Sequence, residues 1–189
     1  AHFPKKTKFI PFPINIKSLG FKEERPQGRP IRFFIGIQRA RSEYKGTDIM
    51  LRALERIHKQ YPNRCEIIKV QSVPYEEYQR LMNTCDVILD QLYSYTPAMN
   101  ALTAMGKGLI LVGGGEPENY EIIQETELRP IINVLPSEED VYQKLEQLVL
   151  HPERINELSK ESRLYVERHH DHTKVAQQYI DFWMQTKRN

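Results

Sequence analysis

Two short apolar runs, separated by about twenty residues, constrain the fold of this chain more than any other feature. Residues 87–89 (VIL) and 109–112 (LILV) carry no polar side chain, as expected of strands that are covered on both faces. Between them, Thr96 and Pro97 suit the first positions of a helix, and glycines before the second run can end it. The segment therefore predicts a strand, a helix and a second strand parallel to the first.

The same alternation of strand and helix continues along most of the chain. We expect further strands at residues 31–36, 65–70 and 131–134. We expect one helix capped by Thr47, one that begins after Pro74 and one at residues 116–125. Three more helices are expected in the last third of the chain, around residues 141–149, 155–166 and 175–183. Repeated units of this kind predict an α/β fold, a doubly wound, Rossmann-like parallel sheet with helices on both faces and extra C-terminal helices. Residues 1–30 are predicted to be an entry segment and linker, and residues 31–189 one domain.

Charge and composition exclude several classes of function. A formal net charge of +2 gives no argument for binding nucleic acid. No stretch is long and apolar enough to cross a bilayer, and the N-terminus lacks both the apolar core of a signal peptide and an initiator Met. We therefore expect a cytoplasmic protein, of which this chain is a cut or processed piece. Cys65 and Cys85 lie beside apolar runs and are expected to be buried free thiols.

Basic residues follow the first predicted strand. In doubly wound sheets, ligands bind beyond the carboxyl ends of the strands, near the point where the strand order reverses. The loop after Gly36 carries Arg39, Arg41 and Lys45, whose guanidinium and ammonium groups suit phosphate. The loop has neither the glycine pattern of a Walker loop nor that of a dinucleotide fingerprint. The loops after Val70, Asp90 and Val112 are the other candidates at this edge.

The helix that begins near residue 96 is a second candidate for anion binding. With Thr96 as N-cap and Pro97 at the first helical position, the free amides of Ala98 and Met99 are expected to point into the same cleft as the basic loop. Free amides, the helix dipole and nearby cations together favour a phosphate or pyrophosphate group. The glycines at 113–115 allow either the close approach of a ligand or a tight turn.

Other polar clusters are predicted to be structural. The histidines and Asp171 of residues 169–172 have a metal-like composition, but adjacent residues of a helix point in different directions. Asp171 is expected to cap the final helix. Glutamate pairs at 76–77 and 138–139 suit helix starts. Among the tyrosines near the predicted cleft, Tyr78 falls on a core-facing position.

The order of these motifs resembles the C-terminal, donor-binding domain of GT-B-fold glycosyltransferases, in the large retaining group often called family four. The matching pieces are the strand ending in Gly36 with its following Arg41, Lys45 and Gly46, and then YEEYQRLMNTCDVILDQL, AMGKGLILV, GGGEPENYEII and RLYVERHHDHTKVAQQY. They cover residues 31–189. Individually each motif is weak, and their order and spacing carry the resemblance.

The resemblance implies a site for a nucleotide-sugar. Arg41 (or Arg39) and Lys45 would neutralise the diphosphate as the nucleoside diphosphate leaves. The backbone of Pro97, Ala98 and Met99 would hold the distal phosphate, and the loop from Gln71 to Val73 would meet the base. It implies no divalent metal or other cofactor, and it assigns no catalytic residue.

One departure from the family concerns two acidic residues. The family places one glutamate in the loop before this helix and another on the helix, where it binds the ribose hydroxyls. The matching positions here are Tyr95 and Thr103, and neither is acidic. A threonine cannot make the charge-assisted contact. Asn100, Glu116 and Glu118 are the candidate substitutes.

Three functions follow from these observations. The first is the donor half of a glycosyltransferase of bacterial glycan or polysaccharide synthesis, whose N-terminal acceptor domain is missing. That missing domain could contact a membrane peripherally, and this fragment alone would be inactive. The second is a degenerate domain that binds a nucleotide or a protein without catalysis, and the third is a sugar-nucleotide epimerase-like enzyme. The third needs an acid-base pair in the cleft, and the sequence offers none; we therefore predict the first.

Overall fold

The computed structural model describes residues 7–21, 24, 26 and 28–186 of the 189-residue chain, and within them it shows one parallel sheet. Its strands are β1 (Ile31–Ile37), β2 (Cys65–Gln71), β3 (Val87–Asp90), β4 (Ile110–Gly113) and β5 (Ile132–Asn133). Their order is β2-β1-β3-β4-β5, and every neighbouring pair is parallel. The chain therefore builds outward from β1 first to one side and then to the other. The predicted doubly wound sheet is confirmed.

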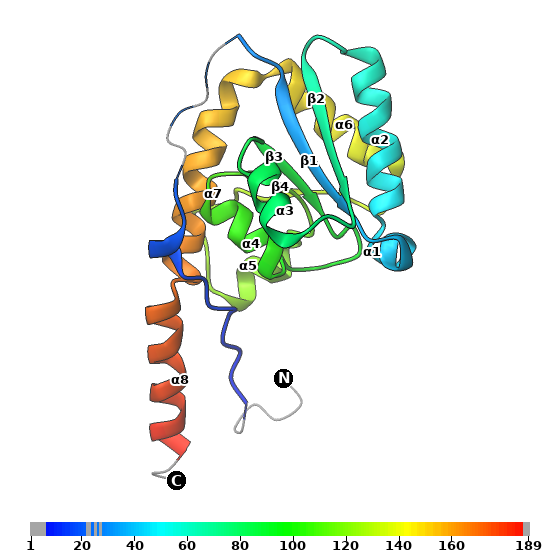
Figure 1. The fold of residues 1–189 in the computed structure, drawn as a ribbon. Coiled ribbons are helices and arrows are strands. Elements are labelled where there is room, and N and C mark those ends of the chain that lie inside the picture. The colour runs from blue at the N-terminus through cyan, green and yellow to red at the C-terminus, as the bar shows by residue number, and fades with distance from the viewer. Residues whose placement is uncertain (1–6, 22–23, 25, 27, 187–189) are drawn as a thin grey trace.

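Helices cover both faces of this sheet (Figure 1). On one face lie α2 (Thr47–Gln60) and α6 (Glu138–Leu150), and on the other α3 (Tyr75–Met82), α4 (Met99–Gly106) and α7 (Ile155–His169). The remaining helical pieces are η1 (Ile16–Ser18), η2 (Arg39–Arg41), α1 (Ser42–Lys45), α5 (Pro117–Ile122), η3 (Pro152–Arg154) and α8 (His172–Thr186).

The central strands are mostly apolar because most of their side chains enter one of two cores. Phe33 and Ile35 pack in the core shared with α2 and α6, whereas Phe34 packs in the core shared with α4 and α7. All three are fully buried. Alternation between two covered faces is what a continuous apolar run in a parallel sheet requires.

Several predicted boundaries are corrected by the structure. Thr47 is the first residue of α2 and not its N-cap, because Gly46 precedes the helix in a left-handed conformation. The helix expected at residues 116–125 ends at Ile122, where the chain turns through a left-handed Gln124. The strand expected at residues 131–134 is shortened to two residues. Such shifts reflect local turn geometry that apolar patterns do not encode.

Part of the predicted entry segment packs on the domain. The amide of Ile14 donates to the carbonyl of His170 at 2.6 Å, and the amide of His172 donates to the carbonyl of Ile14 at 3.0 Å. Ile14 and Ile16 are buried in the core beneath α4 and α7. Residues 1–6, 22–23, 25 and 27 of the predicted entry segment and linker lie outside the described residues.

Helix α8 forms where a third C-terminal helix was predicted, but most of its apolar stripe is exposed. Val175 is buried, but Tyr179 is 40% exposed and Trp183 is 58% exposed. Figure 1 shows α8 extending away from the layered part of the molecule. The predicted N-cap is confirmed, since Asp171 accepts hydrogen bonds from the amides of Thr173 and Lys174.

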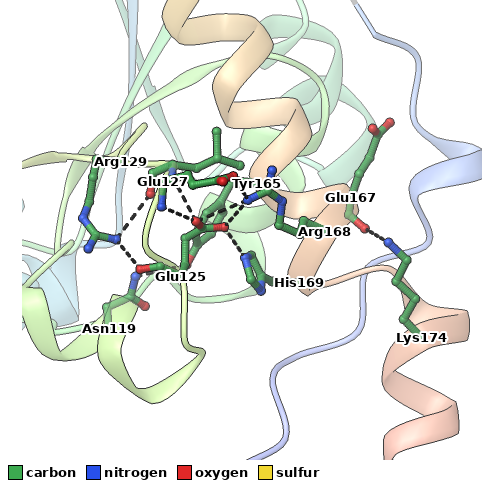
Figure 2. A network of polar contacts seen from close by, with 10 residues as sticks. Asn119, Glu125, Glu127, Arg129, Tyr165, Glu167, Arg168, His169 and Lys174 are labelled. Carbon is green, nitrogen blue, oxygen red and sulfur yellow. Dashed lines mark hydrogen bonds and ion pairs between the residues drawn. The ribbon is translucent and has the colours of Figure 1, made fainter.

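A buried carboxylate joins α7 to the turn after α5 (Figure 2). Glu125 is 4% exposed and accepts from the amides of Glu127 and Leu128 at 2.7 and 3.0 Å. Arg168 lies 3.0 Å from the same carboxylate and His169 lies 2.6 Å from it. Burial alone would raise the pKa of Glu125, but these donors together lower it to about 2. His169 is therefore a hydrogen-bond partner of Glu125 in this structure.

The cysteines are buried free thiols, as predicted, and burial raises the pKa of the Cys65 thiol to about 11. No helix in the described ranges combines the length and the apolar character needed to cross a membrane. Within the same ranges, no three side chains of His, Cys, Asp or Glu are grouped so that they could hold a metal ion.

Candidate functional site

A cleft of 690 Å³ lies at the carboxyl ends of β1, β2 and β3, where the strand order reverses. This is the edge that the sequence singled out, and the place where doubly wound sheets bind ligands. Five of the twelve predicted site residues line it: Arg39, Lys45, Gln71, Val73 and Asn100. The rest of its lining is Gly36, Ile37, Gln38, Ala40, Val70, Ser72, Tyr75, Tyr78, Leu89 and Asp90.

Lys45 is held in place by a contact between two loops. Its carbonyl accepts a hydrogen bond of 2.8 Å from the amide of Leu92, which follows β3. The next residue, Gly46, has a φ of +69°, and a Cβ there would lie 2.6 Å from the Cβ of Leu92. Only glycine allows this approach. The pairing fixes the backbone at the end of α1 against the loop after β3, and the charge of Lys45 acts on Asp90.

Asp90 ends β3 and forms part of the wall of the cleft. It is 9% exposed, and among the described residues it is the one carboxylate in the lining. Burial raises the pKa of Asp90 above its usual value, and the charge of Lys45 and the amide of Asn100 oppose this shift only in part. Two cations, Arg39 and Lys45, thus share the cleft with one buried acid, a combination that suits an anionic ligand with further polar groups.

The aromatic wall of the cleft comes from α3. Tyr78 stands against Gly36, where a Cβ would lie only 3.1 Å from the ring. Its hydroxyl accepts a hydrogen bond of 2.9 Å from the side-chain amide of Asn100 on α4. Burial raises the pKa of Tyr78 to about 12, so the phenol is neutral at physiological pH. The glycine at the end of β1 therefore makes room for Tyr78, and Tyr78 orients Asn100.

The start of α4 differs from the prediction. Its N-cap is Ala98, with extended backbone, and Met99 is the first helical residue. Thr96 is thus not the N-cap and Pro97 is not at the first helical position. The Thr96 carbonyl instead accepts from the Ser94 hydroxyl at 2.7 Å. The first amide of α4 with an intrahelical acceptor is that of residue 102, and the amides of Met99 and the two residues after it are the free ones.

Seven predicted residues lie outside the lining of the cleft. Arg41 and Tyr95 are exposed, and Met99 is 45% exposed. The Thr103 hydroxyl donates to the carbonyl of Met99 at 2.8 Å, within its own helix. Thr96 and Pro97 line a separate cavity of 80 Å³ beside the N-terminal segment. Ala98 directly precedes α4, and its side chain is partly buried.

The glycine triplet at residues 113–115 serves the fold. A Cβ on Gly113 would collide with the carbonyl oxygen of Asp90, and one on Gly114 with that of Ser94. On Gly115 it would lie 2.6 Å from Ile131. In the described structure the space beside each glycine is therefore filled by the protein. The sequence left open the approach of a ligand or a tight turn; the structure shows instead that the glycines allow segments of the protein to pack closely on one another.

Sequence reasoning missed Asp90 and the paired role of Tyr78 with Asn100. A carboxylate directly after three apolar residues, at the carboxyl end of a predicted strand, was the available signal for Asp90. Two left-handed residues also mark this edge: Ser72, with a φ of +53°, and Gln91, with a φ of +49°. Left-handed residues other than glycine tend to cluster at functional sites. The left-handed conformations of Ser72 and Gln91 could not be predicted from the sequence, because serine and glutamine are ordinary residues in loops.

A second cavity, of 560 Å³, lies at the opposite end of the sheet. It includes Asp86, Lys107 and Gly108, which precede or begin the amino ends of β3 and β4. The Lys107 ammonium donates to the side chains of Gln79 and Asn83. This cavity lies away from the edge where the free amides of α4 and the basic loop meet.

Comparison with known proteins identifies the family. A family described as glycosyl transferase-like matches residues 32–181, and the chain belongs to this family. A comparison with curated protein sequences found no match.

Solved structures share the fold at low sequence identity. Sucrose-phosphate synthase from Thermosynechococcus elongatus superposes with a TM-score of 0.66 at 14% identity, over 94% of this chain and 52% of that one. HepE from Anabaena, in complex with UDP, superposes with a TM-score of 0.60 at 12% identity, over 83% of this chain and 49% of HepE. The C-terminal domain of a group 1 glycosyl transferase (LpcC) from Francisella tularensis superposes with a TM-score of 0.58 at 15% identity, over 82% of this chain and 97% of that domain.

These matches confirm the predicted GT-B glycosyltransferase fold. The chain spans about half the length of HepE and of sucrose-phosphate synthase, and nearly all of the isolated C-terminal domain from Francisella.

Proposed function

We propose that this chain is the donor-binding domain of a glycosyltransferase, which binds a nucleoside diphosphate sugar in the cleft between β1, β2 and β3. The observation that carries the proposal is the fixed position of Lys45, held by the Leu92 amide at the point where the strand order reverses. HepE, which shares the fold, was solved with UDP. The acceptor would bind to a second domain, for which the solved structures about twice this length leave room.

The cleft divides into regions that suit parts of such a donor. Lys45 and Arg39 offer positive charge for the diphosphate, and the free amides at the start of α4 add partial positive charge. The backbone of Gln71 to Val73 lies at the end of β2, where the base would lie. We expect no divalent metal to be required, since these groups can balance the charge of the leaving diphosphate. A cytoplasmic location and a role in glycan synthesis belong to the same proposal.

Calorimetry with UDP, GDP and ADP tests the proposal. We expect at least one of them to bind, and Lys45→Ala to weaken its binding by about 1.5 to 3 kcal/mol, the range for a hydrogen bond to a charged group. Lys59→Ala is the matched control, because Lys59 is exposed near the end of α2, away from the cleft. Equal affinities for the two variants would place the diphosphate elsewhere.

A nucleotide-binding domain without catalysis is the second candidate. It is favoured by Thr103, whose hydroxyl is used within α4, and by Tyr95, which is 70% exposed. Neither position carries the acid that the family places there. Assays of donor hydrolysis with the chain joined to its acceptor domain separate the two: turnover supports the enzyme, and binding without turnover supports the second candidate.

A further inference from the structure

One buried polar atom in the cleft is left without a partner. Oδ2 of Asp90 is buried and accepts no hydrogen bond from any described residue. Buried carboxylate oxygens are rarely left unpaired, because each lost hydrogen bond costs free energy. The side-chain amide of Asn100 donates to the Tyr78 hydroxyl and also lowers the pKa of Asp90 through a hydrogen bond to the carboxylate, so the unpartnered atom is Oδ2 alone. No ion pair joins Asp90 to Lys45 within the described structure, although the two lie close enough for their charges to interact.

The surroundings hold Asp90 in this position. Its backbone pairs with Gly113 of β4, where any larger residue would collide with the Asp90 carbonyl. The chain then leaves through left-handed Gln91, a conformation that costs about 1 kcal/mol or more for a residue with a side chain. The carboxylate itself can turn, since the terminal torsion of aspartate is soft.

The chemistry of an ionised carboxylate decides what can pair with it. It accepts hydrogen bonds and donates none, so it repels phosphate oxygens and suits a hydroxyl or an amine. Arg39 and Lys45 supply the complementary charge for phosphate in the same cleft. One ligand can satisfy both halves only if it carries an anionic group and, a few atoms away, a hydroxyl or an amino group; the ribose and the sugar of a nucleotide-sugar supply hydroxyls.

We infer that Asp90 is a specificity-determining residue that accepts a hydrogen bond from a hydroxyl group of the nucleotide-sugar, on its ribose or on its sugar. The inference rests on the proposed function. It gives this chain a carboxylate for hydroxyl recognition on β3, while Tyr95 and Thr103 leave α4 and the loop before it without one.

The test compares ligands with and without hydroxyl groups on Asp90→Asn and Asp90→Leu. Leucine has a similar size and cannot accept a hydrogen bond. The control is Glu76→Gln, which removes the same charge from an exposed position at the start of α3. Calorimetry would use inorganic pyrophosphate, the best-binding nucleoside diphosphate of UDP, GDP and ADP, its 2′,3′-dideoxy form, and its glucose conjugate. Thermal melting confirms that each variant is folded.

We expect both Asp90 variants to bind at least one hydroxyl-bearing ligand about 10- to 100-fold more weakly, and pyrophosphate as well as wild type or better, because a repelling charge is gone. If the dideoxy form binds wild type as weakly as the parent nucleotide binds the variants, the hydroxyl is on the ribose. If only the glucose conjugate is weakened, it is on the sugar.

Two results would overturn this inference without affecting the proposed function. In the first, the Asp90 variants bind pyrophosphate and the nucleotide equally more weakly than wild type, which would show that Asp90 only positions Lys45. In the second, the Asp90 variants bind every hydroxyl-bearing ligand as well as wild type, while Lys45→Ala still weakens their binding. Absence of binding by every nucleotide to wild type would overturn the proposed function and this inference with it. Glu76→Gln should leave all affinities unchanged.

Discussion

The buried Glu125 makes a prediction about stability that can be worked out from its contacts. Its carboxylate accepts hydrogen bonds from two backbone amides and is contacted by the side chains of Arg168 and His169 (Figure 2). These contacts lower its pKa from 4.5 to about 2. A shift of roughly 2.5 pKa units corresponds to about 3 kcal/mol of stability. We therefore expect Glu125→Gln to lower the free energy of unfolding by about 3 kcal/mol at pH 7.

The pH dependence gives this prediction its sign. Because the folded pKa lies below the unfolded value, the carboxylate stabilises the fold fully above about pH 4.5, and the contribution is lost as pH falls toward 2. In urea unfolding at several pH values, the difference between wild type and Glu125→Gln should shrink through this window.

The matched control is Glu127→Gln, which removes the exposed partner of the same Arg168. Glu127 is 73% exposed on its side chain, so its loss should cost less than about 1 kcal/mol. Equal effects of the two variants, or a Glu125→Gln difference that persists unchanged at pH 2, would refute the reasoning.

Three other predictions concern single positions. Burial lowers the pKa of His170 from 6.5 to about 4, so the unfolding free energy should fall as pH drops from 6.5 to 4, and His170→Asn should lack this fall in urea titrations. Gly114→Ala places a Cβ against the Ser94 carbonyl and should cost more than about 2 kcal/mol in the same assay, whereas Gly20→Ala, with no neighbouring atom within 4 Å, should be tolerated. Gly46→Ala should lower stability by about 1 to 2 kcal/mol and weaken nucleotide binding in calorimetry, because it displaces Lys45; unchanged affinity would contradict that role.

The sheet could be predicted from the sequence because its strands are marked by their own residues. Each of β1, β3 and β4 is an apolar run that must be covered on both faces, and the lengths between runs leave room for one helix each. The carboxyl edge of the sheet followed from the topology alone. Because the basic loop follows β1, it had to lie at that edge, and this predicted the place of Lys45 in the cleft.

The details of the site depend on contacts between segments far apart in the sequence. Thr96 and Pro97 carry a local helix-start signal, yet Pro97 is buried and α4 begins two residues later, because packing of the preceding loop outweighs a capping preference of about 1 kcal/mol. The partner of Lys45 is Leu92, and no pattern in the sequence links the two. Likewise, the glycine triplet meets the backbone of Asp90 and Ser94, which only the folded sheet brings close.

The most direct test of the account is a map of backbone amide shifts by NMR while the best-binding nucleoside diphosphate is added. We predict that the perturbed amides cluster at Lys45, at residues 71–73 and at residues 90–92, around the cleft at the carboxyl ends of β1, β2 and β3. Shifts centred on Lys107 and Gly108, at the opposite end of the sheet, or no shifts with any of UDP, GDP and ADP, would contradict it.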